Sequence, residues 1–370
     1  MPFQLDYRIG VKKCNLKNIT FGYLAEKKNA KIKEIPMPEL AEDELLVKQE
    51  ACNICTTDYQ QWLGLREHQG YPMAGGHECS GIVIAKGKAV GDTYQIGDRV
   101  SVLYDYCGYC DECKFGEITN CENKRQFGKN YSKEFYGIFE FANYFVRKAK
   151  SFVKMRPTLS ASEAAFVEPL SSVVQNMKKL RIVPGKETIV IIGGGTMGLL
   201  NGLTARAMGA RVIISEVMPK KLALIKELGF EAIDASQNDP VQKVKELTNG
   251  RGADSVIVAV GSTLAMNQSL EMVKEKDGKI SIYAAGYPAP EMAIQPNTIH
   301  YMRLEVIGTY ASTLEDFYDA ATLLNEGRVD VSKLIETKIP LMDIQKAFEI
   351  ASTPGSYRVS VVLNEEGNKE

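Results

Sequence analysis

The first part of the chain consists of short apolar, β-branched runs separated by glycine and proline. Such runs are typical of β-strands, and many short strands with glycine turns are typical of antiparallel barrel-like domains. We therefore predict a β-barrel domain here, with a cysteine-rich insertion at 107–121. The runs with the clearest strand character are 32–36, 44–50, 79–85 and 98–103.

The pattern changes near residue 160. Ser160 followed by Glu163 has the spacing of a capping box, which predicts the start of a helix. Beyond it, short apolar runs alternate with amphipathic stretches, the pattern of a parallel, doubly wound α/β sheet. The predicted strands are 188–192, 211–215, 254–260, 278–283 and 304–308, and the predicted helices between them include 199–208 and 220–228.

After residue 310 the pattern predicts two helices, 314–326 and 342–351, and a last strand at 358–363. We expect this strand to return to the first domain. The predicted organisation is therefore a catalytic barrel domain formed by 1–165 plus 311–370, and a nucleotide-binding domain formed by 166–310. The length of 370 residues also favours two domains over one core.

Composition excludes several classes of protein. The net charge of −1 gives no general attraction to nucleic acid or an anionic membrane, and no apolar run approaches the length of a membrane span. The N-terminus lacks the basic and apolar regions of a secretory signal. These features predict a cytoplasmic protein acting on a small molecule, in which disulfides do not explain the eight cysteines.

Four of these cysteines, Cys107, Cys110, Cys113 and Cys121, have the spacing Cys-x2-Cys-x2-Cys-x7-Cys. Four thiolates in one short segment can close a tetrahedral shell around zinc, which leaves no open position and predicts a structural site. Buried cysteines without a metal are the plain alternative. A nucleic-acid zinc ribbon is disfavoured because the segment is acidic rather than basic. The cysteines outside both metal sites, Cys14, Cys52 and Cys79, are interpreted as small apolar residues.

A second group of donors lies at Cys55, His77 and Glu78. A thiolate, an imidazole and a carboxylate suit a catalytic zinc, which has three protein ligands and one open position. The third ligand is either Glu78 or a carboxylate from elsewhere, and we favour Glu168. The hydroxyl of Thr57 is placed to take an alcohol proton, and Asp58 to orient His77 through its second ring nitrogen. Helix capping by these two side chains and a plain core histidine are the alternatives.

A glycine-rich loop, Gly193-Gly194-Gly195-Thr196-Met197-Gly198, follows an apolar strand and opens a helix. In that context Gly193, Gly195 and Gly198 predict a dinucleotide site with the phosphates at the helix N-terminus. Glu216 ends the next strand, where its carboxylate would accept from both ribose hydroxyls and repel a 2′-phosphate, which predicts NAD rather than NADP. Lys220 and Lys221 lie nearby and would weaken this preference, and Lys221 is also a candidate contact to the adenine.

With these motifs in the order described, the chain resembles the zinc-dependent medium-chain alcohol dehydrogenases, in particular the sorbitol (L-iditol) 2-dehydrogenase and threonine dehydrogenase types. The resemblance rests on 55–58, 76–78, 97–100, 168–170, the four cysteines and the glycine loop. It implies a GroES-like barrel and a Rossmann domain with the active site in the cleft. It further implies two zinc ions per chain, NAD, and a homodimer or homotetramer.

For individual residues, the resemblance implies Cys55, His77 and Glu168 as ligands of the catalytic zinc, with Glu78 close enough to exchange in. It also places Met197, Thr309 and Tyr310 against the cofactor. Together with the glycine loop, Glu216 and Lys221, these three residues make up the predicted cofactor site.

Two departures from the family pattern affect the predicted substrate and proton path. Gln60 stands where many relatives have the histidine that ends the proton relay, and 308–312 lacks the arginine typical of polyol enzymes. Tyr104, Tyr106 and Trp62 are candidates for an apolar substrate pocket instead.

We expect an NAD-dependent dehydrogenase of a secondary alcohol, with a polyol as the favoured substrate. The alternatives are a bulkier substrate such as an amino alcohol or steroid alcohol, a zinc-free quinone or enoyl reductase, and a non-catalytic NAD sensor.

Overall fold

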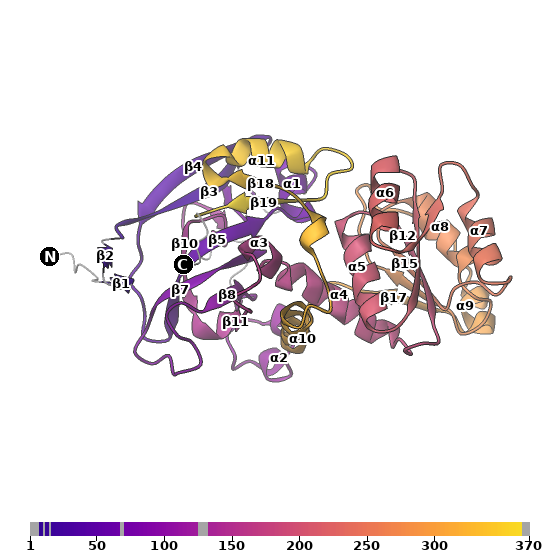
Figure 1. Cartoon of the computed structure of the whole chain (residues 1–370), viewed down its shortest axis with the longest axis horizontal. Coiled ribbons are helices and arrows are strands. Elements are labelled where there is room, and N and C mark those ends of the chain that lie inside the picture. The colour runs from indigo at the N-terminus through magenta and orange to yellow at the C-terminus, as the bar shows by residue number, and fades with distance from the viewer. Residues whose placement is uncertain (1–6, 10–11, 15, 67–69, 125–131, 365–370) are drawn as a thin grey trace. The chain divides into compact units, whose positions relative to one another are not determined.

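The computed structural model describes residues 7–9, 12–14, 16–66, 70–124 and 132–364. The chain divides into two compact units (Figure 1). The barrel unit comprises Met1–Pro169, Thr313–Gly327 and Val331–Glu370, and the Rossmann unit comprises Leu170–Ser312 and Arg328–Asp330.

The barrel unit contains two principal sheets. The larger has the strand order β11-β8-β7-β5-β19-β18, with β10 paired to β5, and is antiparallel except for the β18–β19 pair. The smaller has the order β4-β3-β6-β9. A hairpin of β1 (Tyr7–Ile9) and β2 (Lys12–Cys14) precedes them. The other strands are β3 (Asn18–Glu26), β4 (Asn29–Pro36), β5 (Glu44–Asn53), β6 (Met73–Ala74), β7 (Cys79–Lys86), β8 (Arg99–Val102), β9 (Tyr136–Gly137), β10 (Tyr144–Lys148), β11 (Phe152–Lys154), β18 (Ile335–Pro340) and β19 (Arg358–Val362).

Strand β19 explains how the C-terminal part of the chain joins the first sheet. It pairs antiparallel with the end of β5, where Val361 lies opposite Cys52. Four of its five residues are buried, so the strand contributes to the core of this unit. The helices that have residues in this unit are α1 (Thr56–Leu63), α2 (Asp111–Lys114), α3 (Ala161–Ala164), α4 (Val167–Leu180), α10 (Leu314–Asn325) and α11 (Ile344–Ala351).

The Rossmann unit is built on a six-stranded parallel sheet with the order β14-β13-β12-β15-β16-β17. The strand that comes first in the sequence, β12, lies in the middle of the sheet. The direction in which successive strands are added reverses between β12 and β15, and doubly wound sheets bind their ligands at such a point. All five residues of β12 are buried and apolar or hydroxylated, as expected for a strand covered on both faces. The elements are β12 (Thr188–Ile192), α5 (Thr196–Ala207), β13 (Arg211–Glu216), α6 (Pro219–Glu227), β14 (Glu231–Asp234), α7 (Pro240–Leu247), β15 (Ser255–Val258), α8 (Thr263–Met272), β16 (Lys279–Ile282), α9 (Pro296–Met302) and β17 (Glu305–Gly308).

The two ends of the Rossmann unit meet. Ser171, near its start, and Ser312, at the end of its main segment, are fully buried, and their hydroxyl oxygens lie 2.7 Å apart. The segment between them therefore begins and ends at one point of the fold.

The structure confirms the predicted fold class and the predicted strands of both units. The return of the last strand to the first sheet is also confirmed. The capping box at Ser160 is present, since its side chain accepts from the Glu163 N–H. The helix predicted at 199–208 begins earlier, at Thr196. Elements that were not predicted include β14, α7, α8 and β18.

Cys52 and Cys79 are buried in the barrel core, as expected for apolar residues, whereas the side chain of Cys14 lies outside the described residues. Within the described part of the chain, every helix is too short or too polar to cross a lipid bilayer.

Candidate metal and dinucleotide sites

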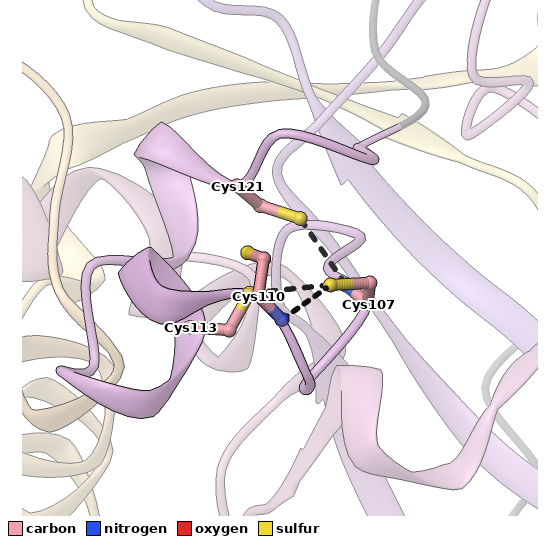
Figure 2. Close-up of side chains that lie close together, drawn as sticks. All are labelled: Cys107, Cys110, Cys113 and Cys121. Atoms are coloured by element: carbon pink, nitrogen blue, oxygen red, sulfur yellow. Dashed lines mark hydrogen bonds between the residues drawn. The ribbon is translucent and has the colours of Figure 1, made fainter.

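The four cysteines of the predicted structural site converge (Figure 2). The sulfurs of Cys107, Cys110, Cys113 and Cys121 all lie within 4.8 Å of one another. The Cys107 and Cys113 sulfurs are 3.9 Å apart, close to the separation of about 3.8 Å in a tetrahedron with Zn–S bonds of about 2.3 Å. The donor set and its spacing therefore fit a zinc ion held by four thiolates.

The backbone of this lobe is arranged around the sulfurs. Desolvation raises the pKa of Cys107, but N–H donation from Tyr109 and Cys110 outweighs it and lowers that pKa to about 6. The turns at Gly108 and Gly116 have φ of +82° and +85°, which glycine adopts without strain. The lobe thus offers one thiol already biased towards the thiolate form that a metal requires.

Helix α1 places the first ligand of the predicted catalytic site. Cys55 is its N-cap, and the Asp58 side chain reaches back to accept from the Cys55 N–H at 2.9 Å. The other Asp58 oxygen accepts from the Gly76 N–H at 3.3 Å and lies 3.6 Å from Nδ1 of His77. Buried Asp58 therefore links the residues around Cys55 to those around His77, in the position expected of an outer partner of a ligating histidine.

Cys55, His77 and Glu78 each offer a donor atom, and these atoms lie within 4.8 Å of one another. Glu78 is fully buried, and its Oε2 has no hydrogen-bond partner among the described residues. A buried carboxylate oxygen without a partner is costly, so its presence beside a thiol and an imidazole indicates a cation. The donor set is the mixed sulfur, nitrogen and oxygen set of a catalytic zinc.

The electrostatics of this group are those of a desolvated cluster. Burial raises the pKa of Glu78 well above its ordinary value, and Arg358 opposes that rise. Burial also lowers the pKa of His77, but Asp58 and Cys55 outweigh this effect and raise it well above the ordinary value. Burial raises the pKa of Cys55, yet His77 outweighs it, so the thiol pKa is lowered overall.

Glu168, the favoured third ligand in the sequence-based prediction, is not among the three residues whose donor atoms lie within 4.8 Å of one another, and its role as a ligand stays a prediction. Glu168 lies in the first turn of α4, and its Oε1 accepts a hydrogen bond from the hydroxyl of Tyr104. The carboxylate is near enough to Glu78 to raise its pKa.

The predicted proton acceptor, Thr57, receives a hydrogen bond from Arg66, whose Nη1 lies 3.1 Å from the threonine Oγ1. Arg66 was not among the residues predicted from the sequence. Trp62, predicted to line a pocket, instead packs in the barrel core, 5% exposed and stacked on Phe348. Tyr106 donates to the carbonyl of Lys150.

In the Rossmann unit, the glycine loop between β12 and α5 has the conformation that the motif requires. Gly193 has φ of +104°, and a Cβ added at Gly198 would lie 1.9 Å from the Gly193 carbonyl oxygen. A Cβ at Gly195 would meet only Lys221 Nζ, at 3.7 Å. The loop is therefore closed where helix and strand pack, and open at the helix N-terminus, where Thr196 and Met197 begin α5 and a phosphate would bind.

Glu216, at the end of β13, is held against this loop. Its Oε2 accepts from the Gly194 N–H at 2.8 Å and lies 3.9 Å from Lys221 Nζ. Its Oε1 accepts from the N–H groups of Val217 and Met218. This carboxylate is thus fixed at the position where the ribose of a dinucleotide is bound in such sheets.

The remaining predicted cofactor contacts follow β17. Thr309 Oγ1 lies 3.2 Å from the side-chain oxygen of Gln175, and Tyr310 is 83% exposed. No contact among the described residues fixes the Tyr310 ring, which leaves its predicted role as a proposal.

Two family models match the chain. The model described as alcohol dehydrogenase GroES-like domain matches residues 41–157, and the model described as zinc-binding dehydrogenase matches residues 196–326. Together they cover most of both units.

Similar proteins of known name span nearly the whole chain. D-arabitol-phosphate dehydrogenase of Enterococcus avium is 30% identical, over 90% of this chain and 94% of its own length. L-threonine 3-dehydrogenase of Bacillus velezensis is 31% identical over 87% of this chain and 92% of its own length. Sorbitol dehydrogenase of Bacillus subtilis is 29% identical over 90% of this chain and 94% of its own length.

A crystal structure from Sinorhizobium meliloti, described as a zinc-binding dehydrogenase bound to NADP, has 29% identity and a TM-score of 0.81, covering 93% of this chain and 99% of that one. The models, the relatives and the two sites agree. This chain belongs to the zinc-dependent medium-chain alcohol dehydrogenases and is an oxidoreductase of that family.

Proposed function

We propose that this protein uses NAD and a catalytic zinc to interconvert a secondary alcohol and its ketone, with a polyol as the substrate class. The observation that carries the proposal is the group of Cys55, His77 and Glu78, whose donor atoms lie within 4.8 Å of one another. The unpartnered Oε2 of Glu78 supports a metal at this point. A second zinc is proposed for the four-cysteine lobe.

The chain's own residues would divide the remaining tasks. When bound, the zinc supplies a Lewis acid for the alcohol oxygen. Asp58 fixes the ring of His77 through Nδ1 and so sets which nitrogen faces the metal. Thr57 accepts the alcohol proton and passes its own hydroxyl proton on. Because Arg66 donates to Thr57 Oγ1, that hydroxyl keeps its own proton available for transfer.

The proposed preference for NAD rests on Glu216. Its charge lies beside the glycine loop, where the 2′-phosphate of NADP would be repelled. Lys221 at 3.9 Å reduces this repulsion without removing it. The S. meliloti structure holds NADP, so the proposed preference of this chain for NAD is tested directly by comparing the two cofactors.

The substrate class is supported by the relatives' names, which include a polyol and a polyol phosphate. The L-threonine 3-dehydrogenases favour a second candidate, an amino alcohol. Gln60 does not discriminate between these candidates, since it concerns the route of the proton rather than the substrate.

A substrate screen with purified enzyme tests the proposal. Polyols, polyol phosphates, amino alcohols and steroid alcohols are supplied with NAD, and NADH formation is followed by absorbance. We expect turnover with polyols, and two zinc ions per chain by metal analysis. No turnover with any secondary alcohol, or a single zinc per chain, would contradict the proposal.

A variant pair separates chemistry from folding. Cys55→Ser should abolish turnover and remove one zinc while NAD still binds, as measured by fluorescence quenching. Cys52→Ser, a core cysteine in the preceding strand, is the matched control and should retain both zinc ions. Wild-type turnover in Cys55→Ser would rule out the proposed site.

A further inference from the structure

A series of side-chain hydrogen bonds crosses the Rossmann unit and ends at the glycine loop. The Ser281 hydroxyl, in β16, donates to Oδ1 of Asn176 in α4 at 2.7 Å. The Asn176 amide donates to Oδ1 of Asn201 in α5 at 2.8 Å. The Asn201 amide in turn donates to the Met197 carbonyl at 2.8 Å. A strand and a second helix are thus connected to the first turn of α5 through the Ser281–Asn176–Asn201 network.

This network is closed off from water. The side chains of Ser281, Asn176 and Asn201 are each 0% exposed. A buried polar group has to find its partner within the protein, and removal of one partner leaves the other desolvated and unpaired. All three hydrogen bonds run in the same direction, from the strand towards the loop, and bonds arranged in this way polarise and strengthen one another. The side chains are therefore held in one orientation.

The network acts on the peptide unit between Met197 and Gly198. A peptide unit is planar and trans, so the direction of the Met197 carbonyl also sets the direction of the Gly198 N–H on its opposite side. Gly198 is the third residue of α5, and the N–H groups of the first helical turn have no partner within the helix. These are the groups that bind a phosphate at a helix N-terminus.

We propose that the Ser281–Asn176–Asn201 network positions the Met197–Gly198 peptide for the pyrophosphate of the dinucleotide. The inference rests on the proposed function, because it takes the glycine loop as the cofactor site. Donors that are already oriented need no reordering when the ligand binds, and this raises affinity. The three side chains are positioning residues that contribute to binding of the phosphates and not of the adenosine part of the cofactor.

The first test is Ser281→Ala, which removes the donor at the end of the network farthest from the loop. We expect the Kd of NADH, measured by its fluorescence, to rise by about fivefold, the effect of one net hydrogen bond. The inhibition constant of adenosine, which lacks the phosphates, should stay the same. Ser281→Thr retains a hydroxyl and should restore the Kd of the wild type.

Ser255→Ala is the matched control. Ser255 lies in β15, the strand paired with β16, and is also 0% exposed. Its hydroxyl has no hydrogen-bond partner among the described residues, so the same substitution removes the same atom without breaking the network. The Kd of NADH in this variant should equal that of the wild type. No rise in Ser281→Ala, or an equal rise in both variants, would overturn the proposal.

Asn201→Leu provides an independent check at the loop end of the network. Leucine has a similar shape but cannot donate to the Met197 carbonyl. We expect the Kd of NADH to rise by about tenfold, and the KM for NAD to rise by more than kcat falls. A role in the core alone would instead lower the urea midpoint of unfolding and leave the Kd of the folded protein unchanged, and that result would refute the inference. Failure of the proposed function would show in the wild type itself, as absent NADH binding or absent alcohol oxidation, before any variant is compared.

Discussion

Arg358 and Glu78 form a buried ion pair across 280 residues of sequence. The arginine begins β19, and the glutamate immediately precedes β7. Their side chains are 4% and 0% exposed. The last strand of the chain therefore delivers the positive charge that stabilises a carboxylate of the proposed catalytic site.

Replacing Arg358 by Gln should leave Glu78 as a buried charge without its ion-pair partner. Removal of one member of such a pair costs about 3–5 kcal/mol of folding stability. We expect a loss of this size in the metal-free protein, measured by urea unfolding, and a smaller loss with zinc bound. Arg99→Gln is the control, since the Arg99–Glu50 pair is equally buried but lies outside the metal group. Equal effects of zinc on both variants would contradict the link to the site.

Glu216→Gln should weaken the preference for NAD. The amide oxygen keeps an acceptor for the N–H groups of Val217 and Met218, whereas the NH2 group cannot accept from the Gly194 N–H, and the neutral side chain no longer repels a 2′-phosphate. We expect the ratio of kcat/KM for NAD over NADP to fall by about tenfold, equivalent to about 1.4 kcal/mol. Steady-state kinetics with both cofactors measures this ratio. Glu216→Ala, which loses the contacts to Val217 and Met218 as well, should weaken the binding of both cofactors, and an unchanged ratio in Glu216→Gln would show that charge is not the determinant.

Cys113→Ser should remove the lobe metal alone. The sulfur of Cys113 is one of four that lie within 4.8 Å of one another, and three thiolates bind zinc more weakly than four. We expect metal analysis to fall from two zinc ions to one, with faster proteolysis of the lobe. Cys79→Ser, a core cysteine outside both groups, should retain both ions. Two ions in Cys113→Ser would exclude the four-cysteine site.

Glu140 should give the protein a distinctive dependence on pH. Burial raises the pKa of this carboxyl to about 8, against the opposing effects of Arg147 and His77, with Cys79 and Glu168 also nearby. The folded protein therefore holds a proton that the unfolded chain releases above its ordinary pKa of about 4.3.

The contribution of Glu140 to the free energy of unfolding should therefore be greatest at low pH. It should fall by up to roughly 1.4 kcal/mol per pH unit as the pH rises towards 8. Glu140→Gln, which cannot ionise, should show less of this decline. Urea unfolding of both proteins between pH 5 and 8 gives the comparison. Parallel curves would show that Glu140 does not titrate in this range.

Features with local spacing could be predicted from the sequence. The four cysteines at 107–121 and the glycine loop at 193–198 each lie within one short segment, so their chemistry can be recognised without the fold. The same is true of the apolar strand before the loop, which the structure confirms as β12. Strands and helices with a strongly periodic apolar pattern could be predicted for the same reason.

Contacts between distant segments could not be predicted. The pairing of Arg358 with Glu78 depends on β19 joining β5, and the bond from Tyr104 to Glu168 depends on the path of the chain between β8 and α4. Both contacts involve carboxylates near Cys55 and His77. The burial of Trp62 against Phe348 is likewise set by the packing of α11, which no local pattern reveals.

The meeting of Ser171 and Ser312 has a consequence for how this protein could be re-engineered. A segment whose two ends are adjacent can be excised and replaced at a single seam, because the flanking chain needs only a short bridge where the insert was removed. Nucleotide-binding modules from relatives with another coenzyme could be grafted at these two serines, which would allow recombination of the cofactor half independently of the metal-bearing half.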